Sequence, residues 1–421
     1  MKTEIIIVGD EVLAGAVIDT NSAALARGLA DLGLTPQKII KVGDDKRAIE
    51  EVLKRALGEA ELVVVAGGMG PTPDDKTVEA VAHALSIRLV LHRPTLMRIQ
   101  RTFQKRGMRM PALAARQALV LKGAKLLDNP VGMVPGMIVT HQGSTVVLLP
   151  GVPVEMEAIL TTGVLPYLRK RFVTNPPSVL RLRTFGLPES RIAEKSARLF
   201  RRYPALTPAF YPSTTGVDVV IRGRSKVLVE RCGRGLVRLL GETVYAVGDK
   251  EIALVVGEAL RRCGLTVATA ESCTGGLVGD MLTNIPGSSD YYRGGVVAYS
   301  NEMKLRLLGV RAETLKRHGA VSAQTVREMA RGVCRLMAAD IGIAVSGIAG
   351  PTGGTRKKPV GLVFIAVAAG EKILVERHIF SGSRRMVKER AAMAALDLCR
   401  RAITSRRPLS AIRRPEKGKG I

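Results

Sequence analysis

The chain of 421 residues is 46% hydrophobic and 24% charged, which is typical of a globular protein with two or three domains. This composition excludes collagen-like, intrinsically disordered and small disulfide-rich proteins. The formal net charge of +27 favours anionic ligands such as nucleotides, although arginine-rich solvated surfaces would give the same charge. With seven Phe, seven Tyr and no Trp, the chain has few of the aromatic side chains on which single-stranded nucleic acids stack.

The sequence predicts neither a targeting segment nor a disulfide framework. The longest apolar stretch, residues 360–369, is about half of the ~20 residues that a membrane helix needs. The N-terminus has no signal-peptide pattern. The cysteines are scattered and form no CxxC pair, so we predict free thiols in a reducing compartment: Cys232, Cys263, Cys273, Cys334 and Cys399. We therefore expect a cytoplasmic protein without a membrane partner.

Residues 1–168 alternate predicted strands and helices. Short β-rich runs at residues 4–8 and Leu62–Ala66 each end at a glycine, and residues 49–57 between them have the apolar spacing of a helix. Another helix is expected to begin near Asn21. Such alternation predicts a parallel sheet covered on both faces, with ligands bound outside the carboxyl ends of the strands.

Two acidic loops follow these strands. The sequence GGMGPTPDD, at residues 67–75, contains glycines that let the backbone come close to a ligand. It ends with Asp74 and Asp75, whose carboxylates can hold a divalent metal that bridges to a phosphate. Asp10 and Glu11 follow the first strand and are expected at the same edge. A tight turn with acidic helix caps is the alternative interpretation. Two further loops can line the pocket or be plain turns: residues 129–132 (NPVG) and 149–153 (LPGVP).

The alternation breaks at residues 173–178, where we predict a linker. A smaller mixed domain is expected over residues 177–248 and a third, alternating domain over residues 249–402. Residues 403–421 predict a disordered basic tail. In these domains strands are expected at residues 179–185, 216–222, 266–270, 296–299, 341–345, 360–368 and 373–380, and helices at residues 188–202, 226–240, 252–260, 323–337 and 385–401.

The loop AESCTGG, residues 270–276, lies between a predicted strand and a predicted helix. A hydroxyl there would meet free backbone N–H groups and the positive helix end, which can stabilise an oxyanion. Ser272 and Cys273 are both candidate nucleophiles. Cysteine would need a histidine, whereas serine needs a base, and Lys304 can serve if burial lowers its pKa. The alternative interpretation is a capped helix with a solvated Lys304 and a buried, unreactive Cys273.

These motifs resemble the CinA (competence/damage-inducible) family. AESCTGG, GGVVAYSNEMK, HGAVS, SGIAGPTGG and KPVG, in this order, are similar to its C-terminal domain, a nicotinamide mononucleotide (NMN) deamidase. GGMGPTPDD, NPVG and LPGVPVEM are similar to its N-terminal domain, which has the MogA-like molybdopterin-binding fold. The segment at residues 182–190 resembles the small KH-like domain that joins the two, without the GXXG loop that KH domains use to clamp nucleic acids.

The resemblance implies an α/β chain with a three-layer MogA-like N-terminal domain, a small α+β KH-like middle domain and an α/β CinA C-terminal domain. It implies that Ser272 is the nucleophile and that Lys304 and Tyr299 are its catalytic partners. Asp10 stands where the family often has Thr. The substrate-binding residues that it implies are Thr274, Gly275, Gly276, Ser346, Gly347 and Arg384 in the third domain and Gly67, Gly68, Gly70 and Thr72 in the first. From the residues themselves we expect Asp74 and Asp75 to be metal ligands, with Asp10 and Glu11 as further candidates.

The expected function is hydrolysis of NMN to nicotinate mononucleotide and ammonia in pyridine nucleotide salvage, without a cofactor. For the first domain the resemblance implies ADP-ribose pyrophosphatase activity with a divalent metal, and for the chain a homodimer. Two alternatives stay open. The first domain can bind molybdopterin or another nucleotide without turnover, or the basic chain can be a competence-related nucleic-acid adaptor, although nucleic acid is the less expected partner.

Overall fold

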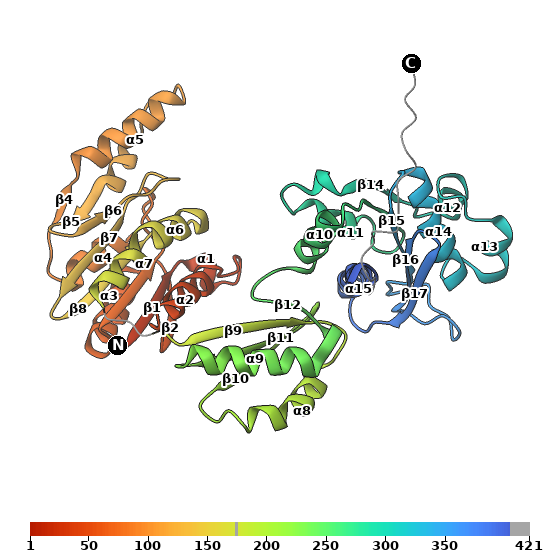
Figure 1. Cartoon of the computed structure of the whole chain (residues 1–421). Coiled ribbons are helices and arrows are strands. Elements are labelled where there is room, and N and C mark those ends of the chain that lie inside the picture. Colours follow the sequence, from red (N-terminus) through yellow and green to blue (C-terminus); the bar gives the residue numbers. More distant parts are fainter. Residues whose placement is uncertain (173–175, 405–421) are drawn as a thin grey trace, which may run out of the picture. The chain divides into compact units, whose positions relative to one another are not determined.

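The structure, a computed structural model of the whole chain, describes residues 1–172 and 176–404. The chain divides into two compact units, Met1–Pro177 and a second that begins at Ser178 (Figure 1). The first unit holds a six-stranded sheet and a two-stranded ribbon, and the second holds a four-stranded and a five-stranded sheet. The predicted linker lies at the junction, and part of it, residues 173–175, is outside the described residues.

A mixed sheet forms the centre of the first unit. Its order is β2-β1-β3-β8-β7-β6, in which the first four strands are parallel and the last two antiparallel. Alternate residues of β1 face opposite layers, since Ile5 and Ile7 belong to one hydrophobic core and Ile6 and Val8 to another. The strands are β1 (Thr3–Val8), β2 (Lys38–Val42), β3 (Leu62–Ala66), β6 (Lys125–Leu127), β7 (Gly136–His141) and β8 (Ser144–Leu149), and the ribbon pairs β4 (Leu89–Leu91) with β5 (Leu119–Leu121).

Helices cover both faces of this sheet. The core on the Ile5 side contains residues of α2, α6 and α7, and the core on the Ile6 side contains residues of α3 and α4. The helices are α1 (Asp10–Leu13), α2 (Asn21–Asp31), α3 (Lys46–Glu59), α4 (Thr77–Ala84), α5 (Arg93–Lys105), η1 (Ala112–Ala118), α6 (Pro153–Ile159), the π-helical turn η2 (Leu160–Val164) and α7 (Leu165–Arg171). The predicted three-layer α/β class is confirmed.

The second unit begins with an antiparallel sheet of order β10-β11-β9-β12. Ile192 of α8 and Leu236 of α9 share one core with Leu182 and Val219 of the sheet, so both helices cover the same face. The elements are β9 (Ser178–Thr184), α8 (Glu189–Phe200), β10 (Thr207–Ser213), β11 (Gly216–Gly223), α9 (Lys226–Leu240), η3 (Gly241–Thr243) and β12 (Val244–Val247). This small α+β sheet corresponds to the expected middle domain.

A second sheet, of order β14-β13-β15-β16-β17, follows in the same unit. One face packs against α10, α11 and α15, and the other against α14. The strands are β13 (Val267–Glu271), β14 (Tyr292–Val297), β15 (Ile341–Gly347), β16 (Leu362–Ala369) and β17 (Lys372–Ile379). The helices are α10 (Ile252–Cys263), α11 (Leu277–Thr283), η4 (Ser288–Asp290), α12 (Asn301–Arg306), α13 (Ala312–His318), α14 (Ala323–Leu336) and α15 (Arg384–Thr404).

Three features differ from the sequence-based expectations. The strand expected at residues 296–299 ends at Val297, so Tyr299 lies in the following loop instead of closing the strand. The helix α15 continues to Thr404, two residues into the predicted tail, and residues 405–421 lie outside the described part. The strands β10 and β12 were not predicted, because β10 contains two prolines and β12 has only four residues.

No helix within residues 1–172 and 176–404 is long and apolar enough to span a bilayer. All five cysteines, including the three buried ones, are free thiols as the sequence predicts.

Candidate functional site

Three parallel strands end at the loops that carry the predicted nucleophile. The strands β14, β13 and β15 run in the same direction, so their carboxyl ends share one edge of the sheet. Ser272 follows β13 directly, and its N–H donates to the carbonyl of Val345 at 2.9 Å. The N–H of Ala298, after β14, donates to the carbonyl of Glu271 at 2.8 Å. Both neighbouring strands therefore fix the backbone around Ser272.

Lys304 reaches this edge from α12, a helix that the Ser300 hydroxyl caps. Its Nζ lies 3.1 Å from Ser272 Oγ, 2.7 Å from the carbonyl oxygen of Ala298 and 3.2 Å from that of Tyr299. Lys304 is 1% exposed and Ser272 is 8% exposed. The structure thus joins the predicted serine and lysine in a buried contact, and the interpretation of Lys304 as a solvated surface residue is wrong.

Burial lowers the pKa of Lys304 from its ordinary value of 10.5, because the charged ammonium loses its hydration. No carboxylate forms an ion pair with Lys304 in the described part of the chain. A neutral amine has two N–H donors and one lone pair. The carbonyls of Ala298 and Tyr299 can accept the two N–H groups, which leaves the lone pair for the hydroxyl proton of Ser272. This is the arrangement of a general base beside a nucleophile.

Cys273, the competing candidate, is buried in the hydrophobic core of the domain. Burial raises the pKa of its thiol to about 12, and the nearby negative charge of Glu271 raises it as well. Because the thiolate is the reactive form of cysteine, this environment makes Cys273 a poor nucleophile. Of the two side chains that the sequence left open, the geometry favours Ser272.

The N-terminus of α11 is occupied by a carboxylate that the sequence analysis did not single out. Glu271, 1% exposed, accepts hydrogen bonds from the N–H groups of Gly276 (3.0 Å), Val278 (3.1 Å) and Gly279 (2.9 Å). This carboxylate neutralises the positive N-terminal end of α11. The helix dipole, which we expected to act on the hydroxyl of the preceding loop, is therefore already balanced by Glu271. An acidic residue just before a Gly-Gly helix start is the signal that could have revealed this cap.

The backbone donors left for an oxyanion therefore lie earlier in the loop. The N–H of Gly276 is committed to Glu271. Within residues 1–172 and 176–404 no acceptor is found for the N–H groups of Cys273, Thr274 and Gly275. These three groups, directly after the nucleophile, are free to stabilise negative charge.

Tyr299 contributes to the site in two ways. Its backbone carbonyl accepts from Lys304, and its side chain, 62% exposed, has a hydroxyl that accepts from Nη2 of Arg384 at 2.9 Å. Nη1 of Arg384 donates to the carbonyl of Gly350 at 2.8 Å. Arg384 thus ties the loops after β14 and β15 to the start of α15.

The third loop at this edge contains Ser346 and Gly347. The Ser346 hydroxyl is buried and donates to the carbonyl of Ala320 at 2.7 Å, so it anchors the HGAVS segment. Gly347 packs against Val363, where a side chain would clash at 2.7 Å. Thr274, in contrast, is fully buried and its Oγ1 has no hydrogen-bond partner among the described residues.

The first unit has a cavity of about 490 Å³ at the carboxyl ends of β1, β3 and β8. Among its lining residues are Gly9, Glu11, Asp44, Gly67, Gly68, Gly70, Asp74, Asp75, Gly151 and Glu155. The structure therefore brings the acidic loop after the first strand to the same edge as the GGMGPTPDD loop. Gly67 has φ +110°, and a side chain there would meet the carbonyl oxygen of Val8 at 2.0 Å, so the tight approach of the two loops needs glycine.

Carboxylates crowd one wall of this cavity. The N–H of Asp10 donates to the Asp44 carboxylate at 2.9 Å, and the N–H of Asp44 donates to the Asp10 carboxylate at 3.1 Å. Burial raises the pKa of Asp44, and the negative charges of Asp10, Glu11 and Asp74 raise it further. This repulsion is the electrostatic signature of a place that favours a cation.

Asp75 holds the glycine-rich loop together. Its carboxylate accepts from the N–H of Gly70 (2.7 Å) and from the N–H (2.9 Å) and hydroxyl of Thr72. Arg116, which the sequence analysis missed, donates to the carbonyl of Thr72 at 2.9 Å and to Glu79 at 2.9 Å. Asp75 and Thr72 are thus bonded to each other within the loop, and a hydrogen bond with the Thr72 side chain also lowers the pKa of Asp74, which lines the cavity.

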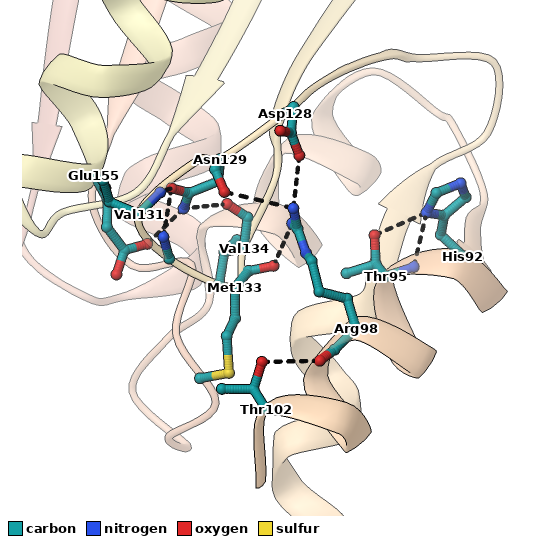
Figure 2. Close-up of polar contacts among 11 residues, drawn as sticks. His92, Thr95, Arg98, Thr102, Asp128, Asn129, Val131, Met133, Val134 and Glu155 are labelled. Carbon is teal, nitrogen blue, oxygen red and sulfur yellow. Dashed lines mark hydrogen bonds and ion pairs between the residues drawn. The ribbon is translucent and has the colours of Figure 1, made fainter. Parts of the chain in front are cut away.

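Figure 2 shows the polar contacts of the NPVG loop. The buried Asn129 accepts from the N–H of Gly132 at 2.8 Å and donates to the carbonyl of Val134 (2.8 Å) and to Glu155 (2.7 Å). Arg98 of α5 donates to Asp128 at 2.6 Å and to the carbonyl of Met133 at 2.8 Å (Figure 2). Asn129 therefore acts from behind the cavity and orients Glu155, which lines it.

The donor chemistry fits a hard divalent cation, because carboxylate oxygens are the ligands that Mg²⁺ and Mn²⁺ prefer. Within residues 1–172 and 176–404, however, no three His, Cys, Asp or Glu side chains are gathered closely enough to hold a metal ion by themselves. Glu11, Asp44 and Asp74 share the cavity. They would complete a coordination sphere together with oxygens from a ligand.

Two family models match the chain. Residues 249–403 match the CinA C-terminal domain, and residues 4–170 match the probable molybdopterin binding domain. These boundaries place the Ser272–Lys304 contact in the former and the acidic cavity in the latter.

The chain is also similar to full-length proteins. It is 40% identical to a CinA-like protein of Kosmotoga olearia, over 96% of this chain and 99% of that protein. It is 39% identical to a CinA-like protein of Chloroherpeton thalassium, over 96% of this chain and all of that protein. Among solved structures, the competence/damage inducible protein CihA from Agrobacterium tumefaciens is 40% identical, covers 36% of this chain and 93% of its own, and gives a TM-score of 0.36.

The burial of Cys273 predicts a pattern of thiol reactivity. At about pH 8 a thiol with a pKa near 12 is ionised to only about one part in 10⁴, so iodoacetamide should leave Cys273 unmodified in the folded chain while it alkylates the exposed Cys263. Peptide mass spectrometry measures both, and the denatured chain, in which all five cysteines should react, is the control. Modification of Cys273 as fast as of Cys263 would contradict the assignment of this thiol as unreactive.

Proposed function

The chain belongs to the CinA family, and we propose that its C-terminal domain hydrolyses the carboxamide of nicotinamide mononucleotide to give nicotinate mononucleotide and ammonia. The observation that carries the proposal is the buried contact of 3.1 Å between Lys304 Nζ and Ser272 Oγ. An uncharged amine beside a serine hydroxyl is the combination that serine-lysine amidases use. No metal or cofactor takes part in the proposed reaction.

In the first step, Lys304 takes the hydroxyl proton of Ser272 and the oxygen attacks the carboxamide carbon. The new C–O bond gives a tetrahedral intermediate with a negative oxygen. The free N–H group of Cys273, directly after the nucleophile, is the donor that can stabilise this oxygen.

In the second step, the ammonium of Lys304 returns its proton to the departing nitrogen, the C–N bond breaks and ammonia leaves. An acyl ester on Ser272 remains. Lys304, again neutral, then takes a proton from water as the water oxygen attacks the ester carbon. The bond between this carbon and Ser272 Oγ breaks, Lys304 returns the proton to the serine oxygen, and nicotinate mononucleotide is released. Arg384 and Tyr299 hold the two flanking loops around these groups.

Removing either partner should abolish the reaction. We expect Ser272→Ala to lower kcat for NMN by about 10⁴-fold or more, since the nucleophile is lost. Lys304→Met, which keeps the shape of the buried side chain without its base, should lower kcat by about 10²- to 10⁴-fold. Ammonia release measures both, and Lys372→Met at the opposite end of the sheet is the matched control. Full activity of Ser272→Ala would remove this serine from the reaction.

The lowered pKa of Lys304 predicts the pH dependence. Only the neutral amine can accept the serine proton, so kcat/KM should rise with pH and level off above the pKa of Lys304, which burial places below 10.5. The measurement is kcat/KM for NMN from about pH 6 to 10, with the nonenzymatic rate subtracted. A rate that falls as pH rises through this range would contradict a lysine base.

For the first domain we propose metal-dependent hydrolysis of a pyrophosphate such as that of ADP-ribose. What supports it is the cavity lined by Glu11, Asp44 and Asp74, in which repulsion between carboxylates favours a cation. A divalent cation bound there would neutralise phosphate charge and polarise a phosphorus–oxygen bond. The chain itself supplies Asp74 as a ligand and a glycine loop, fixed by Asp75, along which a phosphate can lie.

Asp74 and Asp75 should behave differently when substituted. Asp74→Asn keeps the loop but loses a metal ligand, so we expect metal-dependent hydrolysis of ADP-ribose to fall about 100-fold with unchanged thermal stability. Asp75→Asn should also lower the melting temperature of the first unit, because it breaks the bonds that hold the loop. Asp31→Asn, exposed on α2, is the control. Equal nucleotide binding with and without chelator, and no product, would favour binding without turnover.

A further inference from the structure

The start of α15 carries a cation that the proposed reaction does not use. Lys388 is partly buried, and its Nζ lies 3.5 Å from the position where a side chain on Gly275 would begin. Its positive charge also reaches Cys273, next to the nucleophile. In the described part of the chain its ammonium has no hydrogen bond or ion pair. Lys388 is therefore an unpaired charge beside the reactive loop.

The other basic side chains at this end of α15 are already engaged. Arg384, one turn earlier on the same face, donates to Tyr299 and to the Gly350 carbonyl. Arg385 pairs with Glu389 at 2.8 Å, and Arg390 donates to the carbonyl of Ser381. These three guanidinium groups form hydrogen bonds or ion pairs within the protein, whereas the ammonium of Lys388 is available to bind a ligand.

The loop that faces Lys388 is rich in donors. The N–H groups of Thr274 and Gly275 are free, and the buried Oγ1 of Thr274 has no partner among residues 1–172 and 176–404. Gly275 is exposed, has φ +64° and presents bare backbone toward the lysine. A free ammonium beside free N–H groups forms a site for an anion.

The loop keeps Lys388 close enough to the nucleophile for one small ligand to contact both. Ser272 and Gly275 are three residues apart, so their Cα atoms are separated by at most about 11 Å. A ligand with its carboxamide at Ser272 can thus reach Lys388 with a phosphate attached to the other side of its ribose. A compact ammonium recognises a phosphate as a point charge.

We propose that Lys388 binds the phosphate monoester of the substrate and so makes the C-terminal site prefer a nucleotide over the corresponding nucleoside. This inference rests on the proposed amidase function. It assigns Arg384 to holding the loops and Lys388 to substrate selection.

The test compares NMN with nicotinamide riboside, which lacks the phosphate, in the full chain. For Lys388→Met we expect the ratio of kcat/KM for NMN to that for the riboside to fall at least about 10-fold, mainly through KM for NMN. Lys388→Arg should keep most of the preference, and Lys372→Met, at the far end of the sheet, should keep all of it. An unchanged ratio in Lys388→Met, including equal losses on both substrates, would overturn the proposal.

Binding of ribose 5-phosphate separates this inference from the amidase proposal, since this probe has no amide to cleave. Calorimetric titration should show binding to the wild type and to Ser272→Ala, and at least about 10-fold weaker binding to Lys388→Met, while ribose binds none of them measurably. If the wild type releases no ammonia from NMN, the amidase proposal fails and the titration still decides the role of Lys388. Equal affinity of wild type and Lys388→Met for ribose 5-phosphate would show that the lysine does not bind phosphate.

Discussion

The C-terminal site depends on the cost of burying one ammonium group. Lys304 lies at a sheet edge where strand-end carbonyls are available, and within the described residues it meets no carboxylate that would keep it charged. Burial therefore favours the neutral amine, and the two carbonyls orient its lone pair toward Ser272. A carboxylate placed at the same distance would stabilise the ammonium and remove the base. The lack of a counter-ion is thus as important for the chemistry as the 3.1 Å contact itself.

The two candidate sites use the same position in the fold with opposite electrostatics. Both lie where parallel strands end and glycine-rich loops begin, because parallel sheets direct loops of several strands to one edge. In the first domain these loops carry Glu11, Asp44 and Asp74, and the repulsion between their carboxylates favours a cation over an anionic ligand alone. In the C-terminal domain the same edge carries Lys388, which we propose to meet an anionic ligand directly.

Much of the fold could be predicted from the sequence, because long helices and buried strands have clear periodicity. The helix α9 begins and ends where predicted, at Lys226 and Leu240, and β3 has the predicted bounds. The edge strand β10 was missed because its prolines and exposed residues do not alternate like a half-buried strand. For the site, the motif and a lysine 32 positions later suggested the Ser272–Lys304 pair, but only the fold shows that the lysine is buried.

The polar residues whose roles were least predictable are those that hold the loops. Glu271, Asp75 and Asn129 resemble ligands in the sequence, yet their oxygens are occupied by backbone N–H groups. The side chains that we expect to meet a ligand show the reverse pattern, because their polar atoms have no partner among residues 1–172 and 176–404, as for Thr274 and Lys388. Sequence patterns cannot separate the two classes, since both need polar residues beside glycines. The hydrogen bonds in the fold distinguish residues that hold a loop from residues that can bind a ligand. A donor or acceptor that has a partner in the protein fixes the loop, whereas one without a partner at a strand end is available to a substrate.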